Sequence, residues 1–380
     1  MDTNKYSRVN LREVALFFLR LGFTAFGGPA VHIAMMRDEA VVKRKWMSDQ
    51  HFLDLLGATN LIPGPNSTEM AIHVGQERAG WRGLVIGGLC FILPAVLITL
   101  GVACLYKSYG HLPSVQPFIY GVKPAIIAVI IAAIYPLAVK SLQSTELGII
   151  GVISLALCFV GISQIIVLFG AGVVAMGLAA IRSRKDNTLY SFLPLALLQP
   201  TNGRFFSPAN ISLFFSFLKI GAILYGSGYV LFAFLDVELV SKGVISHQQL
   251  IDAIAVGQFT PGPVFSSVTF IGYQANGLYG AIISTIGIFF PSFLFVAFLN
   301  PLVSKMRGSK LFGTFLSAVN VASIALIIFV CYQLGKDSLN NWREILVAIN
   351  SALILFRFRK LNSAFIILGG SLTGYLLLLI

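Results

Sequence analysis

The chain of 380 residues is 57% hydrophobic and only 11% charged, and its mean hydropathy is +0.85. Soluble domains carry roughly 25% charged residues, so this composition excludes a soluble globular protein and indicates one that crosses a membrane several times. The formal net charge of +12 does not indicate a nucleic-acid partner, because the basic residues gather in short loops between apolar stretches.

The first apolar segment, residues 12–36, carries Arg20 in its interior and one glycine-rich break. Arg20 lies about six residues into the apolar run that starts at Val14, at a depth of roughly 10 Å in a helix. A cation near the bilayer centre costs about 2.5–3.5 kcal/mol, so Arg20 either binds an anion or extends its long side chain to the interface. Gly27 and Gly28 permit close approach of the backbone to a ligand, or close packing of two helices. The residues alone leave these alternatives open.

Two short helices are predicted on either side of the sequence Pro63-Gly64-Pro65, over residues 48–62 and 66–78. Proline cannot continue a helix through its own position, but it is favoured where a helix starts. Neither piece reaches the 20 or so residues that a spanning helix needs. The pattern predicts a helical hairpin whose tip lies in the middle of the membrane. The alternative is that Pro-Gly-Pro forms only a tight turn.

The second helix of this hairpin begins with Asn66, Ser67 and Thr68. The free N–H groups and the positive dipole end at a helix N-terminus form an anion site, and these polar side chains can add hydrogen bonds or serve only as caps. Glu69 follows directly. A carboxylate is stable near a helix N-terminus, but it also repels an anion when ionised and admits it when protonated. Glu69 is therefore a candidate for coupling protons to an anion.

The remaining apolar stretches are long, and several suffice to span a membrane as helices. They cover residues 84–106, 117–139, 147–182, 278–303, 312–335, 342–356 and 362–380, the third of which is long enough for two helices. The four cysteines lie in or beside such stretches without CxxC spacing, which is typical of small buried apolar residues. We therefore expect no disulfide, no metal site and no cofactor.

The second half of the chain repeats the first. Pro261-Gly262-Pro263 follows Pro63-Gly64-Pro65 at a spacing of 198 (63 to 261), and Lys219 corresponds to Arg20 at a spacing of 199 (20 to 219). Ser266 and Ser267 follow the second motif as polar residues follow the first, and Ser48 and Ser246 are the predicted N-caps of the helices that precede the two motifs. A duplicated apolar unit with Gly/Pro breaks points to a transporter whose substrate site lies where the two repeats meet.

Loop charges predict opposite orientations for the two halves. Loop 37–47 is basic, whereas the corresponding loop 236–246 holds one lysine beside two acidic residues. Loop 105–115 holds a single lysine, whereas the corresponding loop 303–310 holds three basic residues. Basic loops stay on the cytoplasmic side. Because the basic loop comes early in the first repeat and late in the second, corresponding segments of the two repeats should face opposite sides of the membrane.

We therefore predict an all-α polytopic membrane protein of two inverted-topology repeats, with about five transmembrane helices in each. The first repeat covers residues 1–185, the linker 186–209 and the second repeat 210–380. The basic N-terminus argues for a cytoplasmic start, while an odd number of crossings per repeat places it outside. A first segment that re-enters rather than crosses removes this conflict.

These paired motifs resemble the chromate transporter family. FTAFGGPAVHIAMM with LIPGPNSTEMAIHVG is similar to its first half and FTPGPVFSSVTFIGYQANGLYGAIIS to its second, and the resemblance runs from about residue 11 to residue 380. The residues that match the family motifs are Gly27, Gly28, Pro29, Pro63, Gly64, Pro65, Pro261, Gly262 and Pro263. The second half departs from the family pattern at Tyr225 to Gly228. The resemblance implies export of chromate, a tetrahedral oxyanion similar to sulfate, across the bacterial inner membrane, driven by the proton gradient.

The sequence thus favours a secondary transporter in which an oxyanion binds between the two Pro-Gly-Pro motifs, with Arg20 and Lys219 approaching from opposite faces. The expected partners are this anion and the lipid bilayer, and the sequence leaves open whether the chain forms a homodimer. The alternatives are a carrier of sulfate or another anion, a carrier of lipid-linked anions, and a channel. A membrane-embedded enzyme is disfavoured because GxSxG, HExxH and paired intramembrane aspartates near glycine are missing from the sequence.

Overall fold

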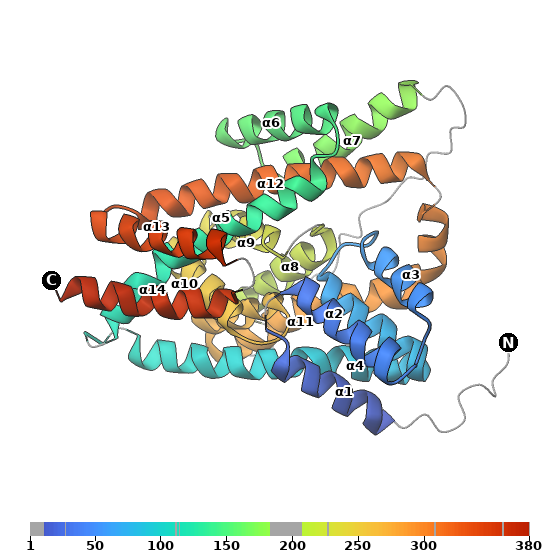
Figure 1. The fold of residues 1–380 in the computed structure, drawn as a ribbon, viewed down its shortest axis with the longest axis horizontal. Coiled ribbons are helices and arrows are strands. Elements are labelled where there is room, and N and C mark those ends of the chain that lie inside the picture. The colour runs from blue at the N-terminus through green and yellow to red at the C-terminus, as the bar shows by residue number, and fades with distance from the viewer. Residues whose placement is uncertain are drawn as a thin grey trace.

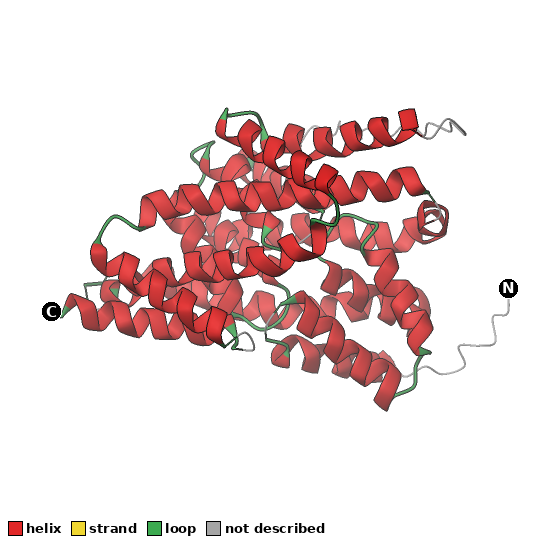
Figure 2. Ribbon diagram, turned by 45° about the horizontal axis from the view of Figure 1, so that its top comes forward, coloured by secondary structure: helices red, strands yellow, loops and turns green. Residues whose placement is uncertain are grey.

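The computed structural model describes residues 11–379, apart from 27, 111, 114, 183–206, 226–227, 308 and 359–360, and it gives no side-chain detail for residues 182 and 299–307. Within the described ranges every regular element is a helix and none is a strand (Figures 1 and 2). The predicted all-α class is confirmed.

The helices of the two halves occur in the same order. The first half contains α1 (Leu11–Thr24), α2 (Pro29–Arg37), the π-helix η1 (Asp38–Lys43), α3 (Asp49–Thr59), α4 (Asn66–Tyr109), α5 (Gln116–Ser141), α6 (Thr145–Phe159) and α7 (Gln164–Arg182). The second half contains α8 (Pro208–Ile223), α9 (Val230–Leu235), the π-helix η3 (Asp236–Val240), α10 (His247–Phe259), the short 3-10 helix η4 (Val264–Ser266), α11 (Ser267–Arg307), α12 (Lys310–Ser338), α13 (Trp342–Arg357) and α14 (Ser363–Leu378).

Corresponding helices of the two halves run in opposite directions. In Figure 1, α5 runs from left to right while its counterpart α12 runs from right to left. The long part of α4 ends at the left of the view, whereas α11 ends at the right. This antiparallel arrangement is the one that inverted repeats produce, and it agrees with the loop charges.

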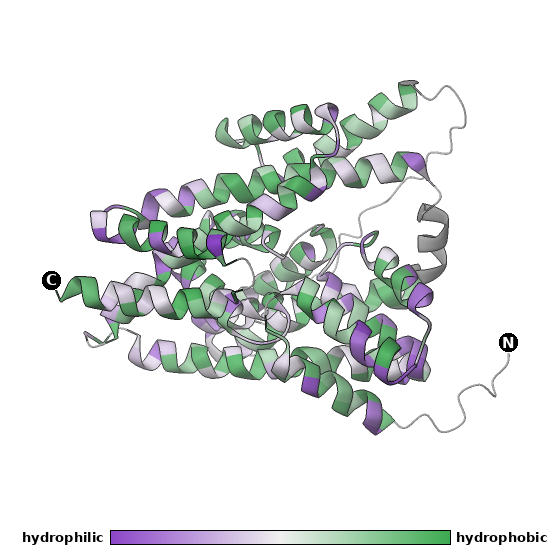
Figure 3. Cartoon of the chain, in the orientation of Figure 1, coloured by the Kyte–Doolittle hydropathy of each residue, from purple (hydrophilic) through white to green (hydrophobic). Residues whose placement is uncertain are grey.

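Five helices in the described part of the chain are long and apolar enough to cross a membrane. They are α4, α5, α7, α11 and α12, while α6, α8 and α14 are apolar but shorter. Figure 3 shows hydrophobic residues along most of the length of these helices. Large apolar side chains such as Val152 and Ile181 are exposed on the outside. An exterior of this kind is suited to lipid rather than to water.

Both Pro-Gly-Pro motifs lie between two short helices, as predicted. The first motif separates α3 from the start of α4, and the second separates α10 from η4 and α11. Ser48 and Ser246 cap α3 and α10 through hydrogen bonds to main-chain N–H groups three residues later. These are the N-caps expected from the sequence.

The second limb of each hairpin is followed by a tight reversal. Ala79-Gly80 and Asn276-Gly277 have nearly the same non-helical backbone angles, with φ of 59° at each glycine. A methyl group added at Gly75 would collide with the carbonyl oxygen of Gly83, although eight residues of unbroken helix would separate them by about 12 Å. Residues 66–78 therefore fold back against the rest of α4, and residues 267–275 do the same in α11.

The close contact between Gly75 and Gly83 at this reversal gives a stability prediction. Gly75→Ala should destabilise the protein by about 1–3 kcal/mol, because the new methyl group overlaps the Gly83 carbonyl group. Gly101→Ala is the control, since nothing lies within 4 Å of its new methyl group, and it should be neutral or slightly stabilising. Thermal unfolding in detergent measures both variants. Equal transition temperatures for the two variants would contradict the reversal.

The first apolar segment also doubles back. The Glu13 carboxylate, near the start of α1, accepts from Arg44, just beyond η1, at 3.0 Å, and from Arg78, at the end of the hairpin limb, at 3.4 Å. Residues 11–44 therefore begin and end at the same end of the molecule. This is the re-entrant arrangement that reconciles the basic N-terminus with the loop charges.

Candidate functional site

The two Pro-Gly-Pro motifs, called here the first tip (Pro63–Pro65) and the second tip (Pro261–Pro263), are both buried inside the protein. The N–H group of Gly64 donates to the carbonyl oxygen of Leu224 at 2.8 Å, and the N–H group of Gly262 donates to that of Ala25 at 2.9 Å. Since Gly262 corresponds to Gly64 and Leu224 to Ala25, each tip docks into the helix break of the other repeat.

The docking follows from unsatisfied main-chain groups. Where α1 and α8 stop, their last carbonyl groups lose intrahelical partners, and the glycine of each tip supplies an N–H group in return. The sequence left open whether these breaks approach a ligand or pack closely against another segment. In the structure, Ala25 and Leu224 at the breaks present carbonyl groups to the opposite tip, which holds the two repeats together.

Polar side chains from both repeats gather at the first tip. A methyl group added at Gly64 would collide with the Glu69 carboxylate and lie 2.7 Å from the Ser292 hydroxyl oxygen. Glu69 and Ser292 are each 0% exposed, and Thr68 is equally buried. The Thr68 hydroxyl group makes no hydrogen bond in the described part of the chain, and the Ser292 hydroxyl group lies beside the Glu69 carboxyl group. Tyr225 follows Leu224, whose carbonyl oxygen accepts from Gly64, so it also lies beside the first tip.

The second tip is surrounded by less polar groups. A methyl group added at Gly262 would lie 3.0 Å from the Ala95 side chain and 3.2 Å from the Gly22 carbonyl oxygen. The hydroxyl group of Thr99 donates to that of Ser266 at 3.3 Å. Ser267 is buried against Gly257. The two tips therefore make matching backbone hydrogen bonds but differ in the side chains around them, and only the second tip is followed by a 3-10 helix, η4.

The other motif residues have mixed placements. Ser67 is buried, whereas the Asn66 amide is turned toward the Asn60 side chain, to which it donates at 2.8 Å. Gly28 has φ of 86° and precedes α2, with open space where a side chain would lie. Gly27 lies outside the described residues.

The two predicted cations lie on the outside of their helices. The Arg20 side chain is exposed on α1. The Lys219 side chain is 48% exposed on α8, and its ammonium group pairs with Glu238 at 2.5 Å. Glu238 is buried and also pairs with Lys242 at 2.5 Å. The structure thus gives Lys219 an acidic partner that the sequence analysis did not consider.

One polar pair joins each hairpin to the helix before it, and the acidic and basic partners exchange places between the two repeats. In the first half, Arg37 donates to Asp49 at 2.6 Å. The equivalent pair in the second half is Asp236 with His247, at 2.9 Å, and His247 also contacts Asp337 at 2.7 Å. The hydrogen bond from Arg37 lowers the pKa of the Asp49 carboxyl group. Equivalent contacts with reversed charge fit the opposite loop charges of the two repeats.

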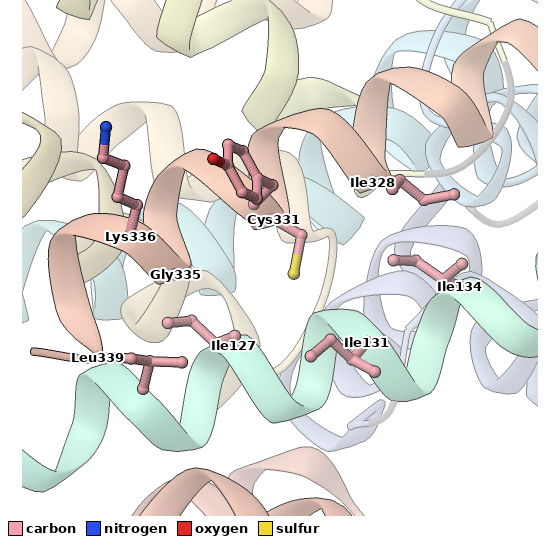
Figure 4. A pocket seen from close by; sticks show the side chains of 9 residues that line it. Ile127, Ile131, Ile134, Ile328, Cys331, Gly335, Lys336 and Leu339 are labelled. Carbon is pink, nitrogen blue, oxygen red and sulfur yellow. The ribbon is translucent and has the colours of Figure 1, made fainter. Parts of the chain in front are cut away.

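A separate groove between α5 and α12 is lined mainly by apolar side chains (Figure 4). Its volume is about 450 Å³, and its lining includes Ile127, Ile131 and Ile328, with Lys336 at one end. None of its lining residues belongs to either tip. Its chemistry suits hydrocarbon rather than a hydrophilic anion. In the described residues, no three His, Cys, Asp or Glu side chains are grouped as metal ligands.

Sequence reasoning missed two residues of the first-tip cluster. Ser292 follows Pro291, whose repetition of Pro94 was visible at a spacing of 197 (94 to 291), but only the fold brings it beside Gly64. Tyr225 stood out as a departure from the first repeat, where Phe26 occupies the corresponding position. Both residues could therefore have been found from the positions at which the two repeats differ.

The sequence model of one family matches both halves. That family is the chromate transporter family, and the matched residues are 12–176 and 211–375. The chain belongs to the chromate transporter family. It is therefore a multi-pass membrane transporter and not an enzyme. The double match confirms two homologous repeats.

Relatives in this family cover most of the chain. A chromate transport protein of Cupriavidus metallidurans is 30% identical over 96% of the chain and 92% of its own length. A probable chromate transport protein of Synechococcus elongatus is 30% identical over 96% and 95%. An uncharacterized transporter of Methanocaldococcus jannaschii is 26% identical over 99% and 98%. No solved structure matches the chain.

Proposed function

We propose that this chain exports chromate, or a similar tetrahedral oxyanion such as sulfate, across the bacterial inner membrane by proton-coupled secondary transport. The observation that carries the proposal is the buried cluster of Thr68, Glu69 and Ser292 at the first tip, which both repeats build. Inverted-repeat transporters bind their substrate where the repeats meet. The relatives named chromate transport protein support chromate as the cargo.

In this proposal, helix N-termini at the two tips hold the anion. Ser67 and Thr68 begin the limb after the first tip, and Ser266 and Ser267 begin the limb after the second. The N–H groups at such ends, with nearby hydroxyl groups, bind oxyanions without a formal positive charge. The glycine break before α2 is held beside the second tip through Ala25, so it belongs to the same region.

Glu69 is the proposed proton-coupling residue. Its carboxyl group is buried next to the first tip, and an ionised carboxylate there would repel a dianion at short range. A proton on Glu69 removes this repulsion and turns the group into a hydrogen-bond donor. Binding of the anion and binding of the proton are therefore linked.

Arg20 and Lys219 are proposed to supply positive charge to the anion as it approaches from either face. Each side chain is exposed, and the two occupy equivalent positions on α1 and α8. A cation beside an access route raises the local concentration of an anion, and salt weakens this effect. Direct contact with the bound anion is not required for that role.

Arg20→Gln and Lys219→Gln should each lower the initial rate of chromate uptake into inside-out vesicles by about 10-fold at low ionic strength, and by less at high salt. Lys336→Gln is the control, since it removes an exposed lysine beside the apolar groove, away from both tips. Uptake of labelled chromate below saturation measures the effect. Control-like rates in both variants would remove the two cations from the mechanism.

The function as a whole is tested with purified protein in proteoliposomes under an imposed pH gradient. Chromate, sulfate, molybdate and phosphate are offered in turn. We expect saturable chromate transport that depends on the gradient and that sulfate inhibits. A cooperative thermal unfolding transition shows that the purified protein is folded. If folded protein transports none of the four anions, the proposal is overturned.

A further inference from the structure

The two tips differ at the three positions that decide whether an oxyanion can bind. Glu69 corresponds to Ser267, Ser292 corresponds to Ala95, and Tyr225 corresponds to Phe26. Of the first members, Glu69 and Ser292 lie against Gly64 at the first tip, and Tyr225 follows Leu224, whose carbonyl oxygen accepts from Gly64. Of the second members, Ala95 faces the second tip with a methyl group, and Phe26 carries no hydrogen-bonding group.

From this asymmetry, and resting on the proposed function, we infer that each chain binds one oxyanion at the first tip, and that Ser292 and Tyr225 are further residues that bind it and determine specificity. The site lies to one side of the two-fold axis that relates the repeats. The second tip is its structural counterpart and holds no second anion.

The chemistry of the cluster selects the ligand. The Thr68 hydroxyl group is buried and makes no hydrogen bond among the described residues, which is costly unless a ligand supplies the missing partner. The Ser292 hydroxyl group is equally buried and lies beside the Glu69 carboxyl group, where both face Gly64. No basic side chain of the described residues pairs with Glu69. The site is therefore built from neutral donors rather than from a countercharge.

Neutral donors favour an anion that only accepts hydrogen bonds. A fully ionised tetrahedral oxyanion such as chromate, sulfate or molybdate fits this requirement when Glu69 carries its proton. Hydrogen phosphate carries an O–H group in place of one acceptor oxygen, so it accepts fewer hydrogen bonds from the same donors and must find an acceptor for its own proton. The inference therefore predicts discrimination against phosphate.

The second tip lacks this set of donors. The hydroxyl group of Ser266 already bonds to Thr99. Ser267 faces Gly257 on the neighbouring helix of its own hairpin, and its buried hydroxyl group makes no hydrogen bond among the described residues. Ala95 takes the place that Ser292 has at the first tip. The second tip therefore has one such hydroxyl group and lacks counterparts of the Glu69 carboxyl group and the Ser292 hydroxyl group, so the two tips are unequal as anion sites.

The test is equilibrium binding of radiolabelled chromate to the purified full-length chain, with transport measured in parallel. We expect one chromate per chain and displacement by sulfate and molybdate but not by phosphate. Ser292→Ala should weaken chromate binding at least 10-fold, because a hydrogen bond to a charged ligand is lost. Ser284→Ala is the matched control, since this serine is also buried on α11 without a hydrogen bond but faces Gly272. It should bind as the wild type does.

Two further variants make the result specific. Tyr225→Phe should weaken binding without changing thermal stability. Ala95→Ser, added to Ser292→Ala, should not restore binding, because the new hydroxyl group lies at the wrong tip. Two chromates per chain, phosphate binding equal to chromate, or normal binding by Ser292→Ala would overturn the inference while chromate transport by the wild type persists. A wild type that neither binds nor transports any oxyanion would instead overturn the proposed function.

Discussion

Glu69→Gln should abolish the response of chromate transport to a pH gradient and leave the exchange of chromate for chromate intact. Glutamine keeps the size and hydrogen-bonding capacity of a protonated glutamate but cannot release a proton. The substituted site should therefore bind the anion at every pH, since the repulsive carboxylate never forms. Without a proton on this residue, an imposed pH gradient has no means to drive net movement.

The measurement compares two transport assays in the same proteoliposomes, gradient-driven accumulation and counterflow. Accumulation of labelled chromate under a pH gradient should fall by at least about 10-fold, while counterflow at equal pH stays within about 2-fold of the wild type, because only the proton-carrying step is removed. Glu77→Gln is the matched control, since Glu77 lies in the same hairpin limb but is partly exposed and pairs with His51 at 3.1 Å. Intact gradient-driven accumulation by Glu69→Gln would rule out Glu69 as the coupling residue.

Gly64→Ala should reduce chromate transport by about 100-fold or more. Gly64 has φ of 137°, a conformation that costs a residue with a side chain on the order of 1–3 kcal/mol. The new methyl group would also collide with the Glu69 carboxylate and crowd the Ser292 hydroxyl group. It fills the space where the proposed anion meets its donors, so the loss of transport should exceed the loss of stability.

Gly80→Ala separates these two effects. Gly80 also has a positive φ, of 59°, but nothing lies within 4 Å of its added methyl group. It should therefore show backbone strain alone, with a lower transition temperature and little change in transport per folded molecule. Transport rates and thermal unfolding are measured on both variants at equal protein. Similar transport by Gly64→Ala and Gly80→Ala would separate the first tip from the transport pathway.

Local rules accounted for the hairpins. Proline cannot continue a helix and glycine permits unusual backbone angles, so Pro63-Gly64-Pro65 marked the position of a tip before any fold was known. Ser246 with Gln249 likewise forms the capping box that its spacing permits. Such features depend on a few neighbouring residues, and a sequence displays them directly.

Contacts across the repeats could not be obtained in this way. Gly64 and Ser292 lie 228 positions apart (64 to 292), and nothing local in either segment requires them to meet. The carbonyl groups at the helix breaks were open to several partners, among them a ligand, water and another chain segment. Packing of the two repeats selected the opposite tip. The sequence also does not show which side of α8 carries Lys219, because that depends on how the helix is rotated about its axis in the fold. Its exposed position and its pair with Glu238 are therefore seen only in the structure.

By itself, the sequence determined that the chain is helical, membrane-embedded and duplicated, because hydropathy, charge and proline chemistry act over short stretches and recur along the chain. Only the tertiary structure decided which tip is polar. The backbone follows the duplication closely, so the two halves dock alike. The side chains at Glu69, Ser292 and Tyr225 have diverged from their counterparts, and their effect depends on three separate segments being packed together in three dimensions.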